Sequence, residues 1–401
     1  MVWFGVVSLT ADMVYEGARS MYGPVLAALG ASATAVGLVT GAGEAMALVL
    51  RLVFGPLADR TGAYWGLTTL GYGLTAFCVP LLAVAPRLGG LGLAAAAVLI
   101  LLERSGKAIR SPSKSALLAH AATSVGRGRG FGVHKALDQI GAFAGPLLVA
   151  GVVAATGSIW PGLAVLAIPG AVAMVLLAVI RRAVPDPSVY DPTPTPPAAQ
   201  PVLGRGVREW FGTAVGAGLP RTFFAYAVAA SLTTGGLVTF GIIGYHLVID
   251  HLVPVASVPV VYAGAMLVEA VAALVVGAVY DRTGGRALTV VPVLVAAVPA
   301  LALTRTLWVA LLGVALWGFA YGVQDSTVKA LVAELVDAPR RATAYGVFAG
   351  IQGAFAIVGG GVSGWLYDRS LTALVVVVGL SQALALLLFI RTARRLPGRQ
   401  Q

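Results

Sequence analysis

The sequence predicts an all-α integral membrane protein with twelve transmembrane helices in two pseudo-symmetric six-helix bundles. Three observations lead to this fold class: an apolar composition, twelve apolar segments and an internal repeat. Apolar residues make up 58% of the 401-residue chain, charged residues make up 11%, and the mean hydropathy is +0.90. Soluble domains carry about a quarter charged residues. The chain therefore has too few polar groups to cover a surface that faces water.

The apolar segments follow one another along the whole chain. They lie near 3–27, 34–57, 65–85, 91–110, 130–155, 159–180, 220–247, 257–279, 287–304, 307–333, 342–366 and 370–391. Most reach the ~20 residues with which a helix crosses a ~30 Å hydrocarbon core. We expect helices because lipid cannot satisfy open backbone groups. The first segment has no basic region before it and contains charges, so we expect a retained helix rather than a cleaved signal peptide.

The basic residues indicate an orientation. The formal net charge is +11. If both ends are cytoplasmic, fifteen Arg fall in inner loops and the tail, against three (Arg87, Arg305 and Arg369) in outer loops. This positive-inside bias predicts a multi-pass protein of the bacterial cytoplasmic membrane with both termini in the cytoplasm. It also argues against nucleic-acid binding. Because Arg outnumbers Lys 23 to 4, the composition is typical of GC-rich bacteria. We expect a monomer.

One long polar stretch divides the segments six and six. It contains the run PDPSVYDPTPTPPAAQP at 185–201, and such Pro-rich runs are extended and semi-rigid. The predicted organisation is an N-terminal bundle at 1–182, a cytoplasmic linker at 183–218, a C-terminal bundle at 219–396 and a basic tail at 397–401.

The two halves share sequence patterns. GPLADRTG at 55–62 matches GAVYDRTG at 277–284 at an offset of 222 residues. At an offset of 214, Gly132 falls on Gly346, Asp138 on Gln352 and Gly145 on Gly359. Membrane carriers commonly bind substrate between two such repeats.

Twelve spans split six and six, with an Asp-Arg turn after the second and eighth, resemble the major facilitator superfamily over essentially the whole chain. Its loop signature falls on Gly55, Asp59, Arg60 and Gly62, and again on Gly277, Asp281, Arg282 and Gly284. Ala63-Tyr64 stands where that family commonly has Arg or Lys. The resemblance implies that both turns lock an inward gate; contact with substrate is the alternative.

A second pattern lies in the fifth apolar segment. Gly132, Gly141, Gly145 and Pro146 resemble the antiporter signature of exporting facilitators, although Val149-Ala150 replaces its trailing Gly pair. The resemblance implies export. Close packing of a small-residue helix face is the alternative, and Pro146 is expected to kink the helix.

Ionisable residues interrupt the apolar segments of the N-terminal half. A charge at the bilayer centre costs at least ~2.5–3.5 kcal/mol, so we expect these side chains to be paired and to face the interior. Several recur at helical spacing. Arg51, Arg104, Lys107 and Lys135 are expected to pair with acids or hold an anionic substrate group, Lys114 to mark a loop, and Arg110 either to snorkel or to face inward. The proton-coupling and substrate candidates are Asp12, Glu16, Arg19, Glu44, Arg51, Glu103, Arg104, Lys107, Arg110, His134, Lys135, Asp138 and Gln139.

The C-terminal half offers fewer polar candidates, namely Gln324, Asp325, Lys329 and Gln352. These side chains are expected to hydrogen-bond either a substrate or one another. The asymmetry places ion coupling in the N-terminal half.

The sequence lacks the patterns of soluble enzymes. It contains no Walker A loop, and the only His pair with near-helical spacing, His246 and His251, is a weak metal signal. We therefore expect no enzyme activity, cofactor or metal. The partners expected are a small-molecule substrate, protons and the lipid bilayer. The favoured function is proton-coupled export by alternating access; uptake by symport or uniport, and a non-transporting sensor or scaffold, are alternatives.

Overall fold

The computed structural model describes residues 2–122, 127–186, 219–283, 288–337 and 340–393. Almost all of the expected linker and the whole basic tail lie outside these ranges. Among the residues in these ranges, none belongs to a β-strand.

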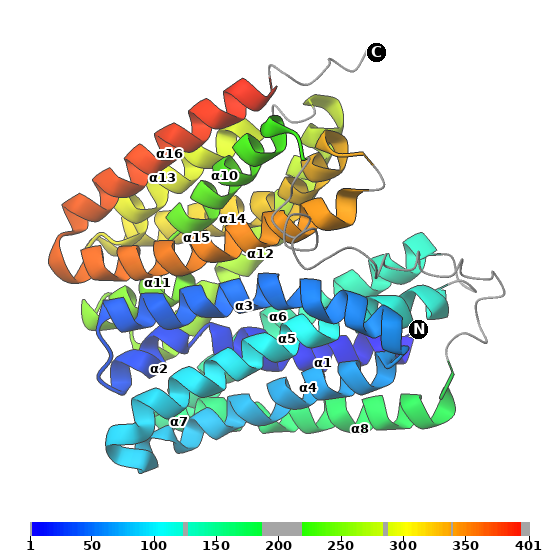
Figure 1. Ribbon diagram of the computed structural model, residues 1–401. Helices are drawn as coiled ribbons and strands as arrows, with labels where there is room; N and C mark the ends of the chain where they lie inside the picture. Colours follow the sequence, from blue (N-terminus) through cyan, green and yellow to red (C-terminus); the bar gives the residue numbers. More distant parts are fainter. Residues whose placement is uncertain (1, 123–126, 187–218, 284–287, 338–339, 394–401) are drawn as a thin grey trace. The chain divides into compact units, whose positions relative to one another are not determined.

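Helix covers each of the twelve apolar segments (Figure 1). The helices are α1 (Val2–Arg19), α2 (Tyr22–Ala28), α3 (Ala33–Thr61), α4 (Tyr64–Leu81), η1 (Leu82–Leu91), α5 (Gly92–Ala122), α6 (Arg127–Thr156), α7 (Ile159–Ala164), α8 (Ala167–Ala183), α10 (Arg221–Gly236), α11 (Phe240–Ile249), η3 (Val255–Ser257), α12 (Val258–Thr283), α13 (Val290–Ala302), α14 (Leu307–Leu335), α15 (Arg341–Arg369) and α16 (Leu371–Ala393).

Within the described ranges, nine helical stretches are long and apolar enough to cross a membrane. One of them, Tyr64–Ala119, is 56 residues long and contains both α4 and α5. Two expected segments fall short of this measure: α1 carries three charged residues, and α13 has only 13 residues. The twelve expected spans are consistent with this arrangement.

Three segments that we expected to be continuous are interrupted. The first breaks between α1 and α2, the sixth between α7 and α8, and the seventh between α10 and α11. In the seventh, Gly235-Gly236 precedes an extended Leu237 (φ −75°, ψ 100°). Paired glycines weaken a helix, and the broken segment frees a carbonyl: Trp317 Nε1 donates to Val238 O at 2.8 Å. Helix breaks of this kind are tolerated in membranes where neighbouring groups satisfy the backbone.

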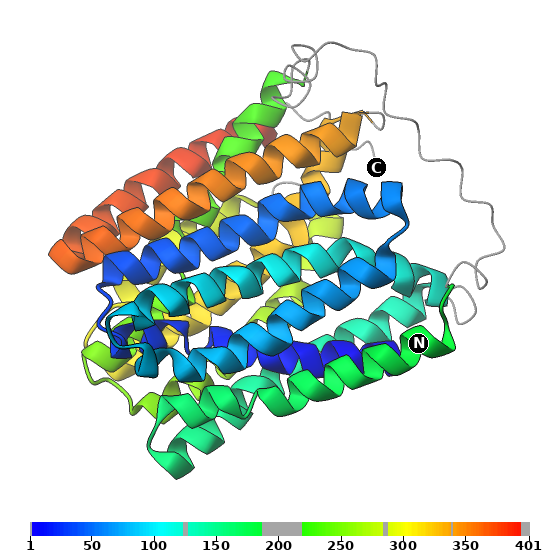
Figure 2. The same cartoon turned by 60° about the horizontal axis from the view of Figure 1, so that its bottom comes forward.

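The chain forms two compact units. Unit 1 comprises residues 1–31, 46–203 and 253–263, and unit 2 comprises 32–45, 204–252 and 264–401. In unit 1, α1 packs on α6 and α4 on α5. In unit 2, α10 packs on α15 and α13 on α14 (Figures 1 and 2). The helices therefore pair in the same way in each unit.

Glycines allow the helix backbones to approach closely at equivalent positions of the two units. A Cβ added to Gly145 of α6 would lie 2.1 Å from Met13 O of α1, and one added to Gly359 of α15 would lie 2.1 Å from Gly235 O of α10. Met13 and Gly235 are themselves 222 residues apart, which is the offset of the repeat. The sequence repeat is thus a repeat of helix packing.

Candidate functional site

Unit 1 brings nine ionisable residues from three of its helices together. We call this set the charged cluster; it consists of Asp12, Glu16 and Arg19 on α1, Glu103, Lys107, Arg110 and Lys114 on α5, and His134 and Asp138 on α6. The expectation that these residues face one another is confirmed by their contacts. Spacings of four, three and four residues on α5 place its four charges on one helix face.

The centre of the charged cluster joins two acids through one arginine. Arg110 Nη2 lies 3.7 Å from Asp12 Oδ1, and Arg110 Nη1 donates to Thr75 Oγ1 of α4 at 2.5 Å. The same hydroxyl lies 3.4 Å from Glu103 Oε1 and 3.4 Å from Gly71 O, so its one proton has two acceptors within reach. Thr75 therefore links Arg110 to Glu103. Arg110 is 3% exposed and does not snorkel to the interface.

Glu103 has a different environment from the other acids. Its side chain is 1% exposed and accepts hydrogen bonds from two hydroxyls, Tyr22 Oη at 2.8 Å and Thr75 Oγ1 at 3.4 Å. No described cation forms an ion pair with it. Burial without an ion pair disfavours the charged form of this carboxyl, whereas the two hydroxyl donors stabilise the carboxylate.

Glu16 is held by groups from three helices. Tyr262 Oη of α12 donates to Glu16 Oε2 at 2.5 Å, and Arg19 and Lys107 lie 3.7 Å and 3.8 Å from its carboxylate oxygens. Lys107 Nζ also lies 3.4 Å from the centre of the Tyr15 ring. Lys107 thus combines an ion pair with a cation–π contact. Arg104 shares that ring at 5.2 Å.

The partners of Asp138 show that one of our expectations was wrong. Its partners are Lys114, 3.7 Å away, and His134, 3.6 Å away. Lys114 does not mark a loop, because α5 continues to Ala122 and keeps this side chain within the bundle. It also donates to Ser8 Oγ at 2.8 Å. Lys135 is exposed, but its charge acts on Asp138, so its expected role stays a prediction.

The remaining N-terminal candidates are more dispersed. Glu44, Arg51 and Gln139 are half-buried. Nε of Arg51 is buried without a hydrogen-bond partner among the described residues. Glu44 belongs to the part of α3 in unit 2, whereas Arg51 belongs to unit 1.

Unit 2 contains a neutral counterpart of the charged cluster. Gln352 Nε2 of α15 donates to Thr234 Oγ1 of α10 at 2.9 Å, and Thr234 Oγ1 lies 3.3 Å from Gln324 Oε1 of α14. At the repeat offsets, Thr234 corresponds to Asp12, Gln324 to Arg110, and Gln352 to Asp138. In the described structure, both glutamines are therefore hydrogen-bonded to the hydroxyl of Thr234 and not to each other. The side chains of Asp325 and Lys329 lie outside the described part.

Aromatic residues replace further charges in unit 2. Trp317 stands at the position of Glu103, and Tyr321 at that of Lys107. Both Glu103 and Trp317 contact the broken first segment of their half, through Tyr22 and Val238 respectively. The rings of Trp317 and Tyr321 stack at 5.3 Å. The same helix positions hold ions in one unit and neutral groups in the other.

Sequence reasoning missed the hydroxyl partners. Ser8 and Tyr15 lie four residues before and three after Asp12, so helical spacing would have identified them. Thr75 and Tyr262 carry no such signal because they come from other helices.

His246 is not poised to bind metal. Its Nδ1 lies 2.8 Å from Asp250 Oδ2, and its Nε2 lies 3.0 Å from Thr304 O. Arg305 pairs with the same aspartate at 3.3 Å. No group of three possible metal ligands occurs in the searched, described residues.

The gate motif is described only in its first copy. Asp59 is exposed and accepts a hydrogen bond from Tyr64 Oη at 3.1 Å. Gly62 has a φ of +62°, which suits glycine and produces the turn into α4. Gly277, Asp281 and Arg282 lie on α12, but their side chains fall outside the described part, as does Gly284 entirely.

The antiporter-like motif packs α6 on α1. Gly141 and Gly145 closely approach Leu9 O and Met13 O, whereas a Cβ added to Gly132 would meet nothing within 4 Å. Pro146 lies inside α6. The packing alternative is thus confirmed for two of the three glycines.

Comparisons with known proteins agree with the fold. An uncharacterized protein of Mycobacterium tuberculosis (strain ATCC 25618 / H37Rv) is 48% identical over 397 residues, which covers 98% of this chain and 92% of that protein. An uncharacterized MFS-type transporter of Methanocaldococcus jannaschii is 27% identical over 144 residues, or 36% of this chain and 35% of that one.

Solved structures share the architecture at low sequence identity. A mutant of the nucleoside transporter NupG has a TM-score of 0.76 at 14% identity and covers 98% of this chain and 99% of its own. A POT family transporter in complex with 5-aminolevulinic acid has a TM-score of 0.73 at 13% identity, with coverages of 98% and 96%. The sequence pattern of the Major Facilitator Superfamily matches residues 6–350 and 222–401. This multi-pass membrane protein therefore belongs to the Major Facilitator Superfamily, whose fold supports secondary transport of small molecules across a membrane.

Proposed function

We propose that this chain is a proton-coupled exporter of a small molecule that works by alternating access, with both termini and the central linker in the cytoplasm. The observation that carries the coupling is the arrangement of Glu103, Thr75 and Arg110. The resemblance of Gly132, Gly141, Gly145 and Pro146 to the antiporter signature supports export, and the Arg distribution supports the orientation.

Glu103 is the proton carrier in this proposal. The guanidinium of Arg110 pairs with Asp12 directly and is connected to Glu103 through the Thr75 hydroxyl. When Arg110 faces Asp12, protonated Glu103 needs no counter-ion. When Arg110 moves toward Glu103, the charge of the guanidinium favours release of the proton. Movement of one side chain thus ties protonation to conformation.

Glu16, Asp138 and the neutral groups of unit 2 have supporting roles in the proposal. Both acids already have cationic partners at 3.7–3.8 Å. Thr234, Gln324 and Gln352 offer neutral donors and acceptors for a substrate.

The test needs a substrate first. Solutes are screened for those that raise the unfolding temperature of the purified protein, and a stabilising solute is then followed in proteoliposomes. We expect Glu103→Gln to lose flux driven by a pH gradient while exchange without a gradient persists. Glu16→Gln is the matched control and should keep coupling. Full coupling in Glu103→Gln would overturn the role of Glu103, and full coupling in the Glu103, Asp12, Glu16, Glu44 and Asp138 neutral variants, each made singly, would overturn proton coupling itself.

A further inference from the structure

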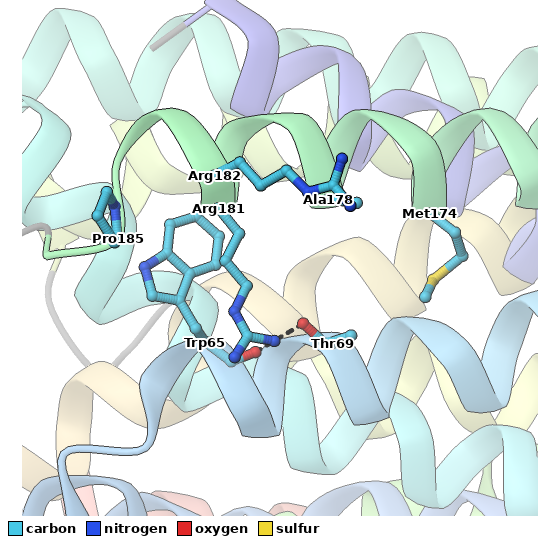
Figure 3. Close-up of a pocket in the computed structure, with 7 residues that line it drawn as sticks. All are labelled: Trp65, Thr69, Met174, Ala178, Arg181, Arg182 and Pro185. Carbon is cyan, nitrogen blue, oxygen red and sulfur yellow. Dashed lines mark hydrogen bonds between the residues drawn. The ribbon is translucent and has the colours of Figure 1, made fainter.

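A cavity of about 470 Å³ lies between α4 and α8 in unit 1, away from the charged cluster (Figure 3). Trp65 and Thr69 line it from α4, and Met174, Ala178, Arg181 and Arg182 line it from α8. Neither transport nor proton coupling, as argued above, uses this cavity.

One end of the cavity is basic and holds an unused hydrogen-bond donor. Arg181 and Arg182 occupy the last turn of α8, are exposed, and form no ion pair with a described acid. Trp65 is only 9% exposed, yet its Nε1 has no hydrogen-bond partner among the described residues. Figure 3 shows Arg181 reaching from α8 toward α4 beside the Trp65 indole. The Trp65 Nε1 atom is itself buried and lies on the Pro185 side of the ring, so the donors that an anion can reach are the two guanidinium groups.

The other end of the cavity is apolar. Met174 and Ala178 precede Arg181 by seven and three residues, so they continue the same face of α8 along the helix. Thr69 adds no donor, because its hydroxyl already bonds Trp65 O at 2.7 Å. The cavity therefore joins a basic, hydrogen-bonding end to an apolar wall, which matches an amphipathic anion.

We propose that this cavity binds an anionic phospholipid of the cytoplasmic leaflet. The phosphate lies at Arg181 and Arg182, and an acyl chain follows Met174 and Ala178. Basic pockets between helices on the cytoplasmic side are suited to lipid head groups, and indoles are enriched at the membrane interface. A free phosphate shares the head-group chemistry but would leave the apolar wall unused. The choice of leaflet rests on the orientation given under Proposed function.

The experiment measures lipid retention by native mass spectrometry of the full chain in detergent. Phosphatidylglycerol is the anionic probe, and phosphatidylethanolamine and inorganic phosphate are the comparison ligands. We expect wild type to retain phosphatidylglycerol, and the double variant Arg181→Gln/Arg182→Gln to bind it at least about tenfold more weakly.

Arg391→Gln is the matched control, since Arg391 lies in the last turn of α16. It should retain the lipid as wild type does. Equal losses in Arg391→Gln and the double variant would show a general charge effect and overturn the proposal. Equal retention of phosphatidylethanolamine, or displacement of phosphatidylglycerol by millimolar phosphate alone, would also overturn it. Binding in detergent requires no transport and no particular orientation, so failure here is distinguishable from failure of the proposed function.

Discussion

Thr75 links Arg110 and Glu103 by hydrogen bonds. Its hydroxyl accepts from Arg110 Nη1 at 2.5 Å and lies 3.4 Å from Glu103 Oε1. The ion pair between Arg110 and Asp12 does not involve it. Removal of the Thr75 hydroxyl therefore tests the proposed proton coupling while it leaves the ion pair between Arg110 and Asp12 in place.

We predict that Thr75→Val lowers gradient-driven flux by roughly tenfold, the effect of about 1.4 kcal/mol, while exchange without a gradient persists. Valine keeps the shape of threonine and removes the hydroxyl. Proteoliposome flux with and without a pH gradient measures both quantities.

Thr68→Val is the matched control. Thr68 lies on the same helix and is fully buried, but its Oγ1 has no hydrogen-bond partner in the described structure. It should transport like wild type. If Thr75→Val keeps full coupling, Thr75 is not the link.

The contrast between these hydroxyls and the charges shows what sequence can predict. Asp12, Glu16 and Arg19 share a face because the helix repeats every 3.6 residues, and that spacing is visible in one segment. The contact between Thr75 and Glu103 depends on how α4 packs on α5. A threonine in an apolar segment is ordinary, so nothing in the sequence distinguishes Thr75 from Thr68.

At the scale of the element, the glycines of α6 and α15 set how closely helices approach. Gly145 and Gly359 each face a backbone oxygen of the first helix of their half, whereas Gly132 and Gly346 face open space. Fold class and repeat were predictable from such spacings. The breaks in the first, sixth and seventh segments were not, because apolar residues continue across them.

We predict that Gly145→Ala and Gly359→Ala each destabilise the protein by about 1–3 kcal/mol, the usual cost of overpacking. The added methyl must push apart two backbones. Thermal unfolding of the purified variants measures the effect. Gly132→Ala and Gly346→Ala are the controls and should unfold like wild type; similar losses at all four positions would contradict the packing explanation.

The start of α3 depends on an acid from α15. Asp368 Oδ1 accepts from Ala33 N at 3.0 Å, and Oδ2 accepts from Thr34 N at 2.9 Å and from Thr34 Oγ1 at 2.6 Å. It satisfies free N–H groups at a helix start, where a negative charge is also favoured.

We predict that Asp368→Ala lowers the free energy of unfolding by about 1 kcal/mol, as loss of a helix cap does. Asp368→Asn retains an acceptor and should lose less. Unfolding temperatures of the two variants provide the comparison. Equal losses would assign the effect to charge rather than to capping.

At the scale of the whole molecule, the proposed orientation is open to direct labelling. The single cysteine, Cys78, is buried at 6% exposure, so a Cys78→Ala background leaves one introduced thiol. We predict that Ser188→Cys in the linker reacts with a membrane-impermeant maleimide only after the membrane is permeabilised.

Gly90→Cys is the control for the opposite side. Gly90 is exposed in η1, where an added Cβ meets nothing within 4 Å. It should react in intact cells. Labelling of Ser188→Cys in intact cells would contradict the predicted orientation and place the linker outside.

The neutral counterpart formed by Thr234, Gln324 and Gln352 has a consequence for how such carriers evolve. Asp12 and Arg110 meet at the same helix positions as Thr234 and Gln324, so an ionic and a neutral contact occupy equivalent places in two descendants of one duplicated segment. Exchange between them requires no change of backbone. If proton coupling works as proposed, a lineage can lose it, or move it to the other half, through a few substitutions while its fold stays the same.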